Sequence, residues 1–279
     1  MVLRVPTGLS PSKVESFTSC PLAFKFSAID KLPEPPAPAA TKGTLVHRAL
    51  ELLLDAPAAE RTLERALAEL DRAFDELSVH HEYTGLELTD EAAETFLGDA
   101  EKLVRRYFEL EDPRSITPIG LELRVEVDLD GLLLRGIIDR LELDDDGELV
   151  VTDYKTGRAP SERYEQGRLG GVHFYAYLCE RLFGRRPARI QLLYLSQPIA
   201  IIATPSDQSI RFLPKKVGAV WSAVERACAT DDFRPKPGML CGYCAFKPWC
   251  PSHGGDPAQA LVEAPVLYGR KPVAAPLPA

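Results

Sequence analysis

Two short runs between residues 136 and 157 carry the side chains whose types could do chemistry. Asp139 ends the apolar run "GIID", and Asp153 and Lys155 follow "VVT" in "VVTDYKTG". Side chains two positions apart on a strand share a face, so Asp153 and Lys155 should lie together. The turn signal "DDDG" separates the two runs, and pairing them across this turn could bring Asp139 near Asp153.

Two carboxylates at a sheet edge form a hard oxygen site that suits Mg²⁺ or Mn²⁺. A nearby ammonium can orient or deprotonate a water and offset the charge that develops on a scissile phosphate. A D-x-K triplet taken alone is more often a pair of ordinary exposed charges on a hairpin. These charges interrupt apolar strands, where they are costly without a partner or a metal, and this favours a metal site.

A second group of reactive residues is "CGYCAFKPWC", which places Cys241, Cys244 and Cys250 near the end of the chain. Three thiolates do not complete a tetrahedral metal site or hold a four-cysteine cluster, so a further ligand is needed. We find no signal peptide and no apolar run that spans a membrane, so we expect a cytoplasmic protein with reduced cysteines. In that setting a tight cysteine group indicates a metal or redox site. Cys179 and Cys228 lie on apolar helical faces and are expected to be buried thiols.

The overall charge limits how the protein could bind nucleic acid. The 279 residues carry a net charge of −8. A general polyanion binder would be basic, so DNA binding must rely on local basic patches or bound cations. The stretches "RRYF" (105–108) and "GRRPAR" (184–189) could follow a nucleic-acid backbone. They are more simply interpreted as solvated faces.

Hydrophobic periodicity predicts the elements that position these residues, and together they form one mixed α/β domain. A helix capped by Ser10 should break at Pro21, and the Pro-rich linker "LPEPPAPAA" should follow. An antiparallel meander should begin at residue 116. The Pro- and Ala-rich tail, 254–279, should be disordered. The remaining predicted elements are a helix from Thr44, helices over 60–77 and 90–110, a helix over 172–183, strands "RIQLLYLS" and "AIIATP", and a helix over 214–230.

In their order along the chain, these segments resemble the PD-(D/E)XK nucleases, and specifically the RecB-family exonucleases. "GIID" and "VVTDYKTG" are similar to the family's core, and "GTLVHRALELLL" to its G-x-x-x-H helix. "LSPSKVESFTSCPLAFKF" and "CGYCAFKPWCP" are similar to its opening and closing segments. The resemblance implies a restriction-endonuclease-like core, with a mixed central sheet flanked by helices. It also implies one nuclease domain over 1–253, made of an N-terminal helical part (9–112), a catalytic α/β core (116–230) and a cysteine-cluster segment (231–253).

The resemblance also implies the catalytic residues. His47, Asp139, Asp153 and the carbonyl of Tyr154 would hold Mn²⁺ or Mg²⁺, and an activated water would attack the phosphodiester with help from Lys155. Imidazole suits Mn²⁺ better than Mg²⁺, so we expect a preference for manganese. A lone histidine on an amphipathic helix is otherwise more often a surface or core residue, so the role of His47 rests on the resemblance.

The cysteine segment resembles that of the family's iron–sulfur subgroup, which includes AddB-type nuclease domains and CRISPR-adaptation nucleases. In that subgroup one cysteine precedes the nuclease core and three follow it. The resemblance therefore implies a 4Fe–4S cluster that joins the two ends of the chain. Four thiolates also suit Zn²⁺, and the preference for iron–sulfur comes from the family. The implied ligands are Cys20, Cys241, Cys244 and Cys250.

One motif departs from the family pattern. Relatives carry Q-x-x-x-Y on the helix after the D-x-K strand, whereas Gly171 stands here at the glutamine position and Tyr175 at the tyrosine position. Gln166 lies five residues earlier, in what we expect to be a loop broken by glycines. Tyr175 has helical spacing to apolar neighbours, so a core role for it is as reasonable as a role in DNA binding and catalysis.

Together these features predict a metal-dependent DNA nuclease, an exonuclease on single-stranded DNA or DNA ends in repair or recombination. The sequence has no phosphate-loop motif, so unwinding would need a separate helicase partner. Two alternatives stay open. One is a CRISPR-adaptation nuclease that trims captured ends, and the other is a non-catalytic DNA-binding module with a structural metal.

Overall fold

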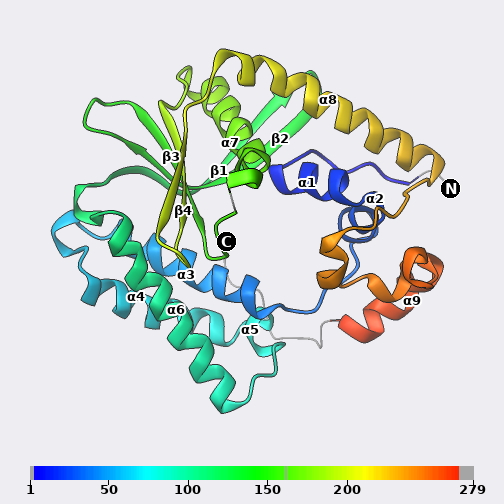
Figure 1. Ribbon diagram of the computed structural model, residues 1–279, viewed down its shortest axis with the longest axis horizontal. Helices are drawn as coiled ribbons and strands as arrows, with labels where there is room; N and C mark the ends of the chain where they lie inside the picture. Colours follow the sequence, from blue (N-terminus) through cyan, green and yellow to red (C-terminus); the bar gives the residue numbers. More distant parts are fainter. Residues whose placement is uncertain (1–2, 161, 270–279) are drawn as a thin grey trace. The chain divides into compact units, whose positions relative to one another are not determined.

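A mixed sheet is the centre of the larger of two units in the computed structural model, which describes residues 3–160 and 162–269 (Figure 1). The larger unit, here called the sheet unit, comprises Pro36–Leu129 and Leu134–Leu213. The smaller unit, here called the terminal unit, combines the chain up to Pro35, the turn Asp130–Leu133 and the chain from Pro214. The contacts group the chain into these two units, and the single nuclease domain over 1–253 stays a prediction.

The described strands of the sheet follow the order β1-β2-β3-β4-β5. The meander expected from residue 116 forms β1, β2 and β3, and β2 pairs with β3 in antiparallel fashion, with Arg140 opposite Thr152. β3 and β4 are parallel, so they need a long crossover, and α7 (Glu162–Phe183) supplies it. β4 then pairs with β5 in antiparallel fashion. The strands are β1 (Thr117–Leu129), β2 (Leu132–Leu143), β3 (Leu149–Lys155), β4 (Arg189–Tyr194) and β5 (Ile199–Ala203).

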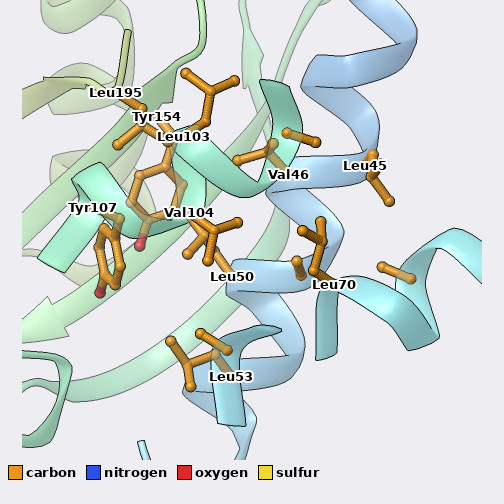
Figure 2. Packing of buried hydrophobic residues seen from close by; sticks show 14 of the residues in the cluster. Leu45, Val46, Leu50, Leu53, Leu70, Leu103, Val104, Tyr107, Tyr154 and Leu195 are labelled. Atoms are coloured by element: carbon orange, nitrogen blue, oxygen red, sulfur yellow. The ribbon is translucent and has the colours of Figure 1, made fainter. Parts of the chain in front are cut away.

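Three helices pack together against the sheet and enclose the main core of the sheet unit (Figure 1). Apolar residues at helical spacing on α3 meet those of α4 and α6, and Tyr154 and Leu195 reach the same cluster from the sheet side (Figure 2). Each fully buried leucine contributes roughly 1.5–3 kcal/mol, so this cluster anchors both α3 and the end of β3. The helices are α3 (Pro38–Asp55), α4 (Leu63–Ser78) and α6 (Asp90–Leu110), with the short α5 (His81–Thr84) between the last two.

Three helices begin earlier than the sequence predicted. α3 begins at Pro38 rather than Thr44, because proline is compatible with the first turn of a helix. α7 spans Glu162–Phe183, so the glycine-containing stretch that we expected to be a loop is helical. α8 spans Asp207–Thr230 and contains Pro214 in its interior. None of the described helices has the length and apolarity to cross a membrane.

The terminal unit has its own core, built from both ends of the chain. α1 (Pro11–Ser19) begins at the predicted cap, where Ser10 accepts a hydrogen bond from the backbone of Lys13. α2 (Pro21–Phe24) continues into a π-helical turn over Lys25–Ile29. Aromatic side chains from these elements pack with the second half of α8 and the cysteine segment, and the rings of Phe26 and Phe246 lie 5.2 Å apart.

The stretch 254–279 was expected to be disordered, but it contains α9 (Pro257–Tyr268). The helix forms because its alanines have a core to pack on: Ala260 and Ala264 are fully buried. Trp249 also donates its indole N–H to Glu263 of α9 at 2.7 Å. Residues 270–279 lie outside the described part of the chain.

Candidate active site

The hairpin of β2 and β3 places Asp139 and Asp153 on one face of the sheet. Arg140 pairs with Thr152 in the ladder, and each aspartate lies one position away from that pair, so both side chains leave the opposite face. The two carboxylates are 11% and 14% exposed, respectively. The backbone N–H of Tyr154 donates to Asp139 Oδ2 at 2.8 Å, which fixes one carboxylate against the strand that carries the other.

α3 brings His47 to the end of β3. A Cβ at Gly43, one turn earlier on the helix, would lie 3.3 Å from Thr156 Oγ1, so glycine allows α3 to approach the strand closely. His47 Nε2 lies 3.1 Å from the carbonyl oxygen of Tyr154, and His47 Nδ1 lies 3.5 Å from Asp139 Oδ2. At the point where α3 meets the end of β3, the imidazole therefore contacts the Tyr154 carbonyl with one nitrogen and the Asp139 carboxylate with the other.

Glu122 also reaches this point, and sequence reasoning missed it. Its carboxylate lies 3.7 Å from His47 Nδ1, and ligand atoms of Glu122, His47 and Asp139 all lie within 4.8 Å of one another. Strand alternation would place Glu122 with the exposed Arg124 and Glu126. Its backbone adopts φ 43° instead, an unusual conformation for a non-glycine residue that redirects the side chain. The sequence did offer one signal for Glu122, because its carboxylate lies between two leucines in "GLELR".

The protonation of these groups reflects crowding of negative charge. Burial, and then the neighbouring Asp153 carboxylate, raise the pKa of Asp139 to about 7. Burial alone would lower the pKa of His47, but its contact with Glu122 and the charge of Asp139 outweigh burial and raise it. The negative charge gathered around these two side chains thus contributes to both raised pKa values.

Lys155 lies beside this group rather than within it. Its ammonium nitrogen is 2.5 Å from Asp153 Oδ2, and the side chain is 44% exposed. Burial would lower the pKa of Lys155, but the Asp153 carboxylate outweighs that effect and raises it. Lys155 therefore carries a proton and a positive charge at neutral pH.

Tyr175 lies on α7 near the two aspartates. A Cβ at Gly136 would lie 2.8 Å from the Tyr175 ring, so the glycine of "GIID" makes room for this tyrosine. Burial, followed by the charges of Asp153 and Asp139, raises the pKa of Tyr175 well above its usual value. Tyr175 thus packs on the sheet and borders the site at the same time. Gln166 falls within α7 rather than in a loop, and its side chain lies outside the described part of the structure.

The basic stretches 105–108 and 184–189 form ion pairs on the surface of the sheet unit. Arg105 pairs with Glu101 at 2.7 Å, and Arg185 pairs with Glu148 at 3.1 Å. Tyr107 is fully buried, so it offers no stacking surface to a base. These stretches behave as the solvated faces that the sequence favoured.

The four predicted cluster cysteines line one cavity of about 620 Å³ in the terminal unit. The backbone N–H of Lys236 donates to Cys20 Sγ at 3.5 Å, and that of Gly238 donates to Cys241 Sγ at 3.3 Å. Among the described residues, no three of the cysteine sulfurs lie within 4.8 Å of one another. Cys179 and Cys228 are fully buried, as expected for core thiols.

The donor set at the sheet suits a hard divalent cation. Carboxylate and carbonyl oxygens with one imidazole nitrogen are ligands that Mg²⁺ and Mn²⁺ accept in proteins, and imidazole favours Mn²⁺. The raised pKa of Asp139 is consistent with a site whose negative charge needs such a cation. All of these donors belong to the sheet unit.

Two phage proteins and one solved structure are similar to this chain. The gene 69 protein of Mycobacterium phage D29 is 31% identical over 177 residues, which cover 57% of this chain and 65% of the phage protein. The gene 69 protein of Mycobacterium phage L5 is 24% identical, over 87% of this chain and 95% of its own length. Neither name describes a function.

A crystal structure from Eubacterium rectale, described as "Putative exonuclease", matches with a TM-score of 0.52. It is 12% identical and covers 85% of this chain and 87% of its own, which shows a shared fold. The family comparison is more specific. Residues 8–251 match the PD-(D/E)XK nuclease superfamily, a span that includes the acidic hairpin, the His47 helix and the cysteine segment. The chain therefore belongs to the PD-(D/E)XK nuclease superfamily.

Proposed function

We propose that this protein is a Mn²⁺- or Mg²⁺-dependent DNA nuclease that acts as an exonuclease on single-stranded DNA or DNA ends. The observation that carries the proposal is the convergence of His47, Glu122 and Asp139 beside the Asp153–Lys155 pair. Membership of the nuclease superfamily and the fold shared with the E. rectale protein support it. The absence of a phosphate-loop motif supports a substrate that is already single-stranded, or one opened by a separate helicase.

Each residue has a distinct task in this proposal. When bound, a divalent ion supplies Lewis acidity and lowers the pKa of a water. His47, Glu122, Asp139, Asp153 and the Tyr154 carbonyl would hold that ion. Lys155, which Asp153 keeps protonated, would face the negative charge that develops on the phosphate. Tyr175 would border the bound strand.

Labelled single-stranded DNA tests the proposal. We expect degradation with Mn²⁺, slower degradation with Mg²⁺ and none with EDTA. Ca²⁺ should bind without supporting turnover, because its looser coordination positions a water less well. Lys155→Ala should remove most activity and leave Mn²⁺ binding nearly unchanged, while Lys102→Ala, which removes an exposed lysine paired with Asp99, serves as the control. DNA binding without any cleavage would favour the non-catalytic alternative, and full activity in EDTA would refute the metal chemistry.

We also propose that Cys20, Cys241, Cys244 and Cys250 bind a 4Fe–4S cluster. Their shared cavity and the backbone N–H donors to two of the sulfurs support this assignment. Four thiolates suit both Zn²⁺ and an iron–sulfur cluster, and the preference for iron–sulfur comes from the resemblance to the iron–sulfur subgroup. Anaerobic purification with iron and zinc analysis tests the assignment, because one zinc and no iron per chain would refute it.

A further inference from the structure

A fully buried arginine lies directly behind the carboxylate pair. Arg140 follows Asp139 on β2, and its guanidinium leaves the opposite face of the sheet, where it is 0% exposed. It forms a two-fold contact with the Glu111 carboxylate, one bond of which is 2.9 Å long, and its Nε lies 2.7 Å from Glu142. A buried guanidinium is costly unless it is paired and hydrogen-bonded, and these two carboxylates supply the charge.

The same guanidinium holds both residues that flank Asp153. Arg140 Nη1 donates to the Tyr154 hydroxyl at 2.9 Å, and Nη2 donates to Thr152 Oγ1 at 3.0 Å. Gln191 on β4 donates to the same threonine oxygen at 2.7 Å. One side chain therefore ties β2 to β3 at the positions next to both aspartates.

Tyr154 links this buried network to the candidate metal site. Its side chain points to Arg140, while its backbone faces the site: the N–H binds Asp139 Oδ2, and the carbonyl lies 3.1 Å from His47 Nε2. Movement of the Tyr154 ring would therefore also move the Tyr154 carbonyl, which is a candidate ligand, and the Tyr154 N–H, which orients Asp139. Figure 2 shows the Tyr154 ring in the core beside Tyr107, whose hydroxyl also accepts a bond from Arg140, at 3.4 Å.

We propose that Arg140 is a positioning residue for the metal site, and that it acts through Tyr154 and Thr152. The side chains of Asp139 and Asp153 leave the same face of the β2–β3 hairpin, and like charges placed together repel. Arg140 opposes the separation of these strands from the far face of the sheet, so the ligands keep their spacing before a cation arrives. The inference rests on the proposed function, because it assigns Arg140 to the same metal site.

A matched pair of tyrosine variants tests the inference. Tyr154→Phe removes the hydroxyl that connects Arg140 to the site. Tyr107→Phe also removes a hydroxyl that accepts a hydrogen bond from Arg140, but Tyr107 is not one of the candidate metal ligands. The measurements are the Mn²⁺ dissociation constant, obtained from the EPR signal of free Mn²⁺, and separate kcat and KM values for single-stranded DNA. We expect Tyr154→Phe to weaken Mn²⁺ binding about five- to tenfold and to lower kcat at limiting Mn²⁺, with KM unchanged. Tyr107→Phe should stay within about twofold of the wild type.

A second pair keeps the test decisive if Tyr154→Phe is too unstable to study. Thr152→Val removes the oxygen that accepts the Arg140 bond, and Thr152→Ser keeps it. The serine variant should bind Mn²⁺ as the wild type does, and the valine variant should bind it several-fold more weakly. Equal Mn²⁺ affinities for the wild type, Tyr154→Phe and Thr152→Val would overturn the inference and leave the metal site intact. A wild-type protein that binds no Mn²⁺ would overturn the proposed function, and the inference with it.

Discussion

The proposed acidic metal site and the proposed cysteine site gather their candidate ligands in different ways. Asp139, Asp153 and the Tyr154 carbonyl come from one hairpin, and His47 joins them from a helix packed in the same core. Cys20 lies between α1 and α2, whereas the other three candidate cysteines lie more than 200 residues later. Cys241 is in the 3₁₀ turn Met239–Tyr243, and Cys244 and Cys250 each directly follow a 3₁₀ turn. Backbone ladders therefore position the acidic ligands, whereas the cysteines depend on loops that a bound group would hold together.

This difference predicts opposite responses to the loss of each bound group. A sheet keeps its register without a metal, because its hydrogen bonds and buried side chains hold it. A bound group whose ligands lie far apart in the sequence closes a long loop. When the group leaves, the unfolded chain regains the conformational entropy of that loop, so the folded state becomes less stable. Removing the divalent cation should thus affect activity, whereas removing the cluster should affect stability.

Substitution of Asp153 by asparagine should give the largest effect on activity. Asp153→Asn keeps the shape of the side chain but removes a charged ligand and the partner of Lys155. Cleavage of single-stranded DNA with Mn²⁺ should fall by about 1,000-fold or more, equivalent to roughly 4 kcal/mol, with an unchanged circular dichroism spectrum. Asp146→Asn, in the exposed turn between the strands, is the control and should be fully active. Comparable activity of Asp153→Asn and the control would remove Asp153 from the site.

Loss of Cys20 should give the largest effect on stability. Cys20→Ser should purify without colour and without the roughly four irons per chain of a cubane cluster. The midpoint temperature of the first unfolding transition should fall by several degrees, because the cluster would no longer join the N-terminal and C-terminal segments of the terminal unit. Cys228→Ala is the control, since it creates a small buried cavity that costs about 1–2 kcal/mol but should retain iron. Full iron content in Cys20→Ser would exclude Cys20 as a ligand.

Stability without metal should depend on pH in a defined direction. The pKa of Asp139 is about 7 in the folded protein and near 3.8 when unperturbed, and the pKa of His47 is also raised. The folded state therefore binds protons more tightly than the unfolded state, so stability falls as pH rises from about 4 to about 7.

Urea unfolding in EDTA at about pH 4.5 and pH 8 measures this loss. The Asp139 shift alone accounts for roughly 2–4 kcal/mol. Saturating Mn²⁺, which takes the place of the proton, should restore the loss at pH 8. Asp139→Asn should reduce the change in the free energy of unfolding between the two pH values. If the free energy of unfolding changes with pH equally in the wild type and in Asp139→Asn, Asp139 is not the group whose raised pKa causes the dependence.

Replacement of Gly171 should give the smallest effect. The residue lies inside α7, so Gly171→Gln should stabilise the helix by up to about 1 kcal/mol. If the family motif acts here, the variant should also bind single-stranded DNA a few-fold more tightly and cut it faster. Gly98→Gln is the matched control, because Gly98 lies in α6 and a Cβ there meets nothing within 4 Å. Equal DNA affinity in both variants would mean that other residues place the DNA.

Much of the sheet could be predicted from the sequence because its signals are local. Alternation and the "DDDG" turn indicate the β2–β3 hairpin, and the alternation also places Asp153 with Lys155. The helix boundaries were less accurate: Pro38 was assigned to a non-helical linker but begins α3, and Pro214 was expected to begin a helix but lies inside α8. α9 was missed because its stability comes from burial of Ala260 and Ala264 against the terminal core, which composition does not reveal.

The sequence by itself determined the superfamily, the acidic hairpin and the identity of most candidate ligands, because these depend on residue type and short spacing. Only the tertiary structure decided that Glu122 joins His47, since a left-handed φ breaks the alternation that would turn this side chain outward. The tertiary structure also decided that Arg140 lies behind both aspartates. In the sequence Arg140 is one more charge on a strand, and its burial follows from the packing of α6 and β3 around it.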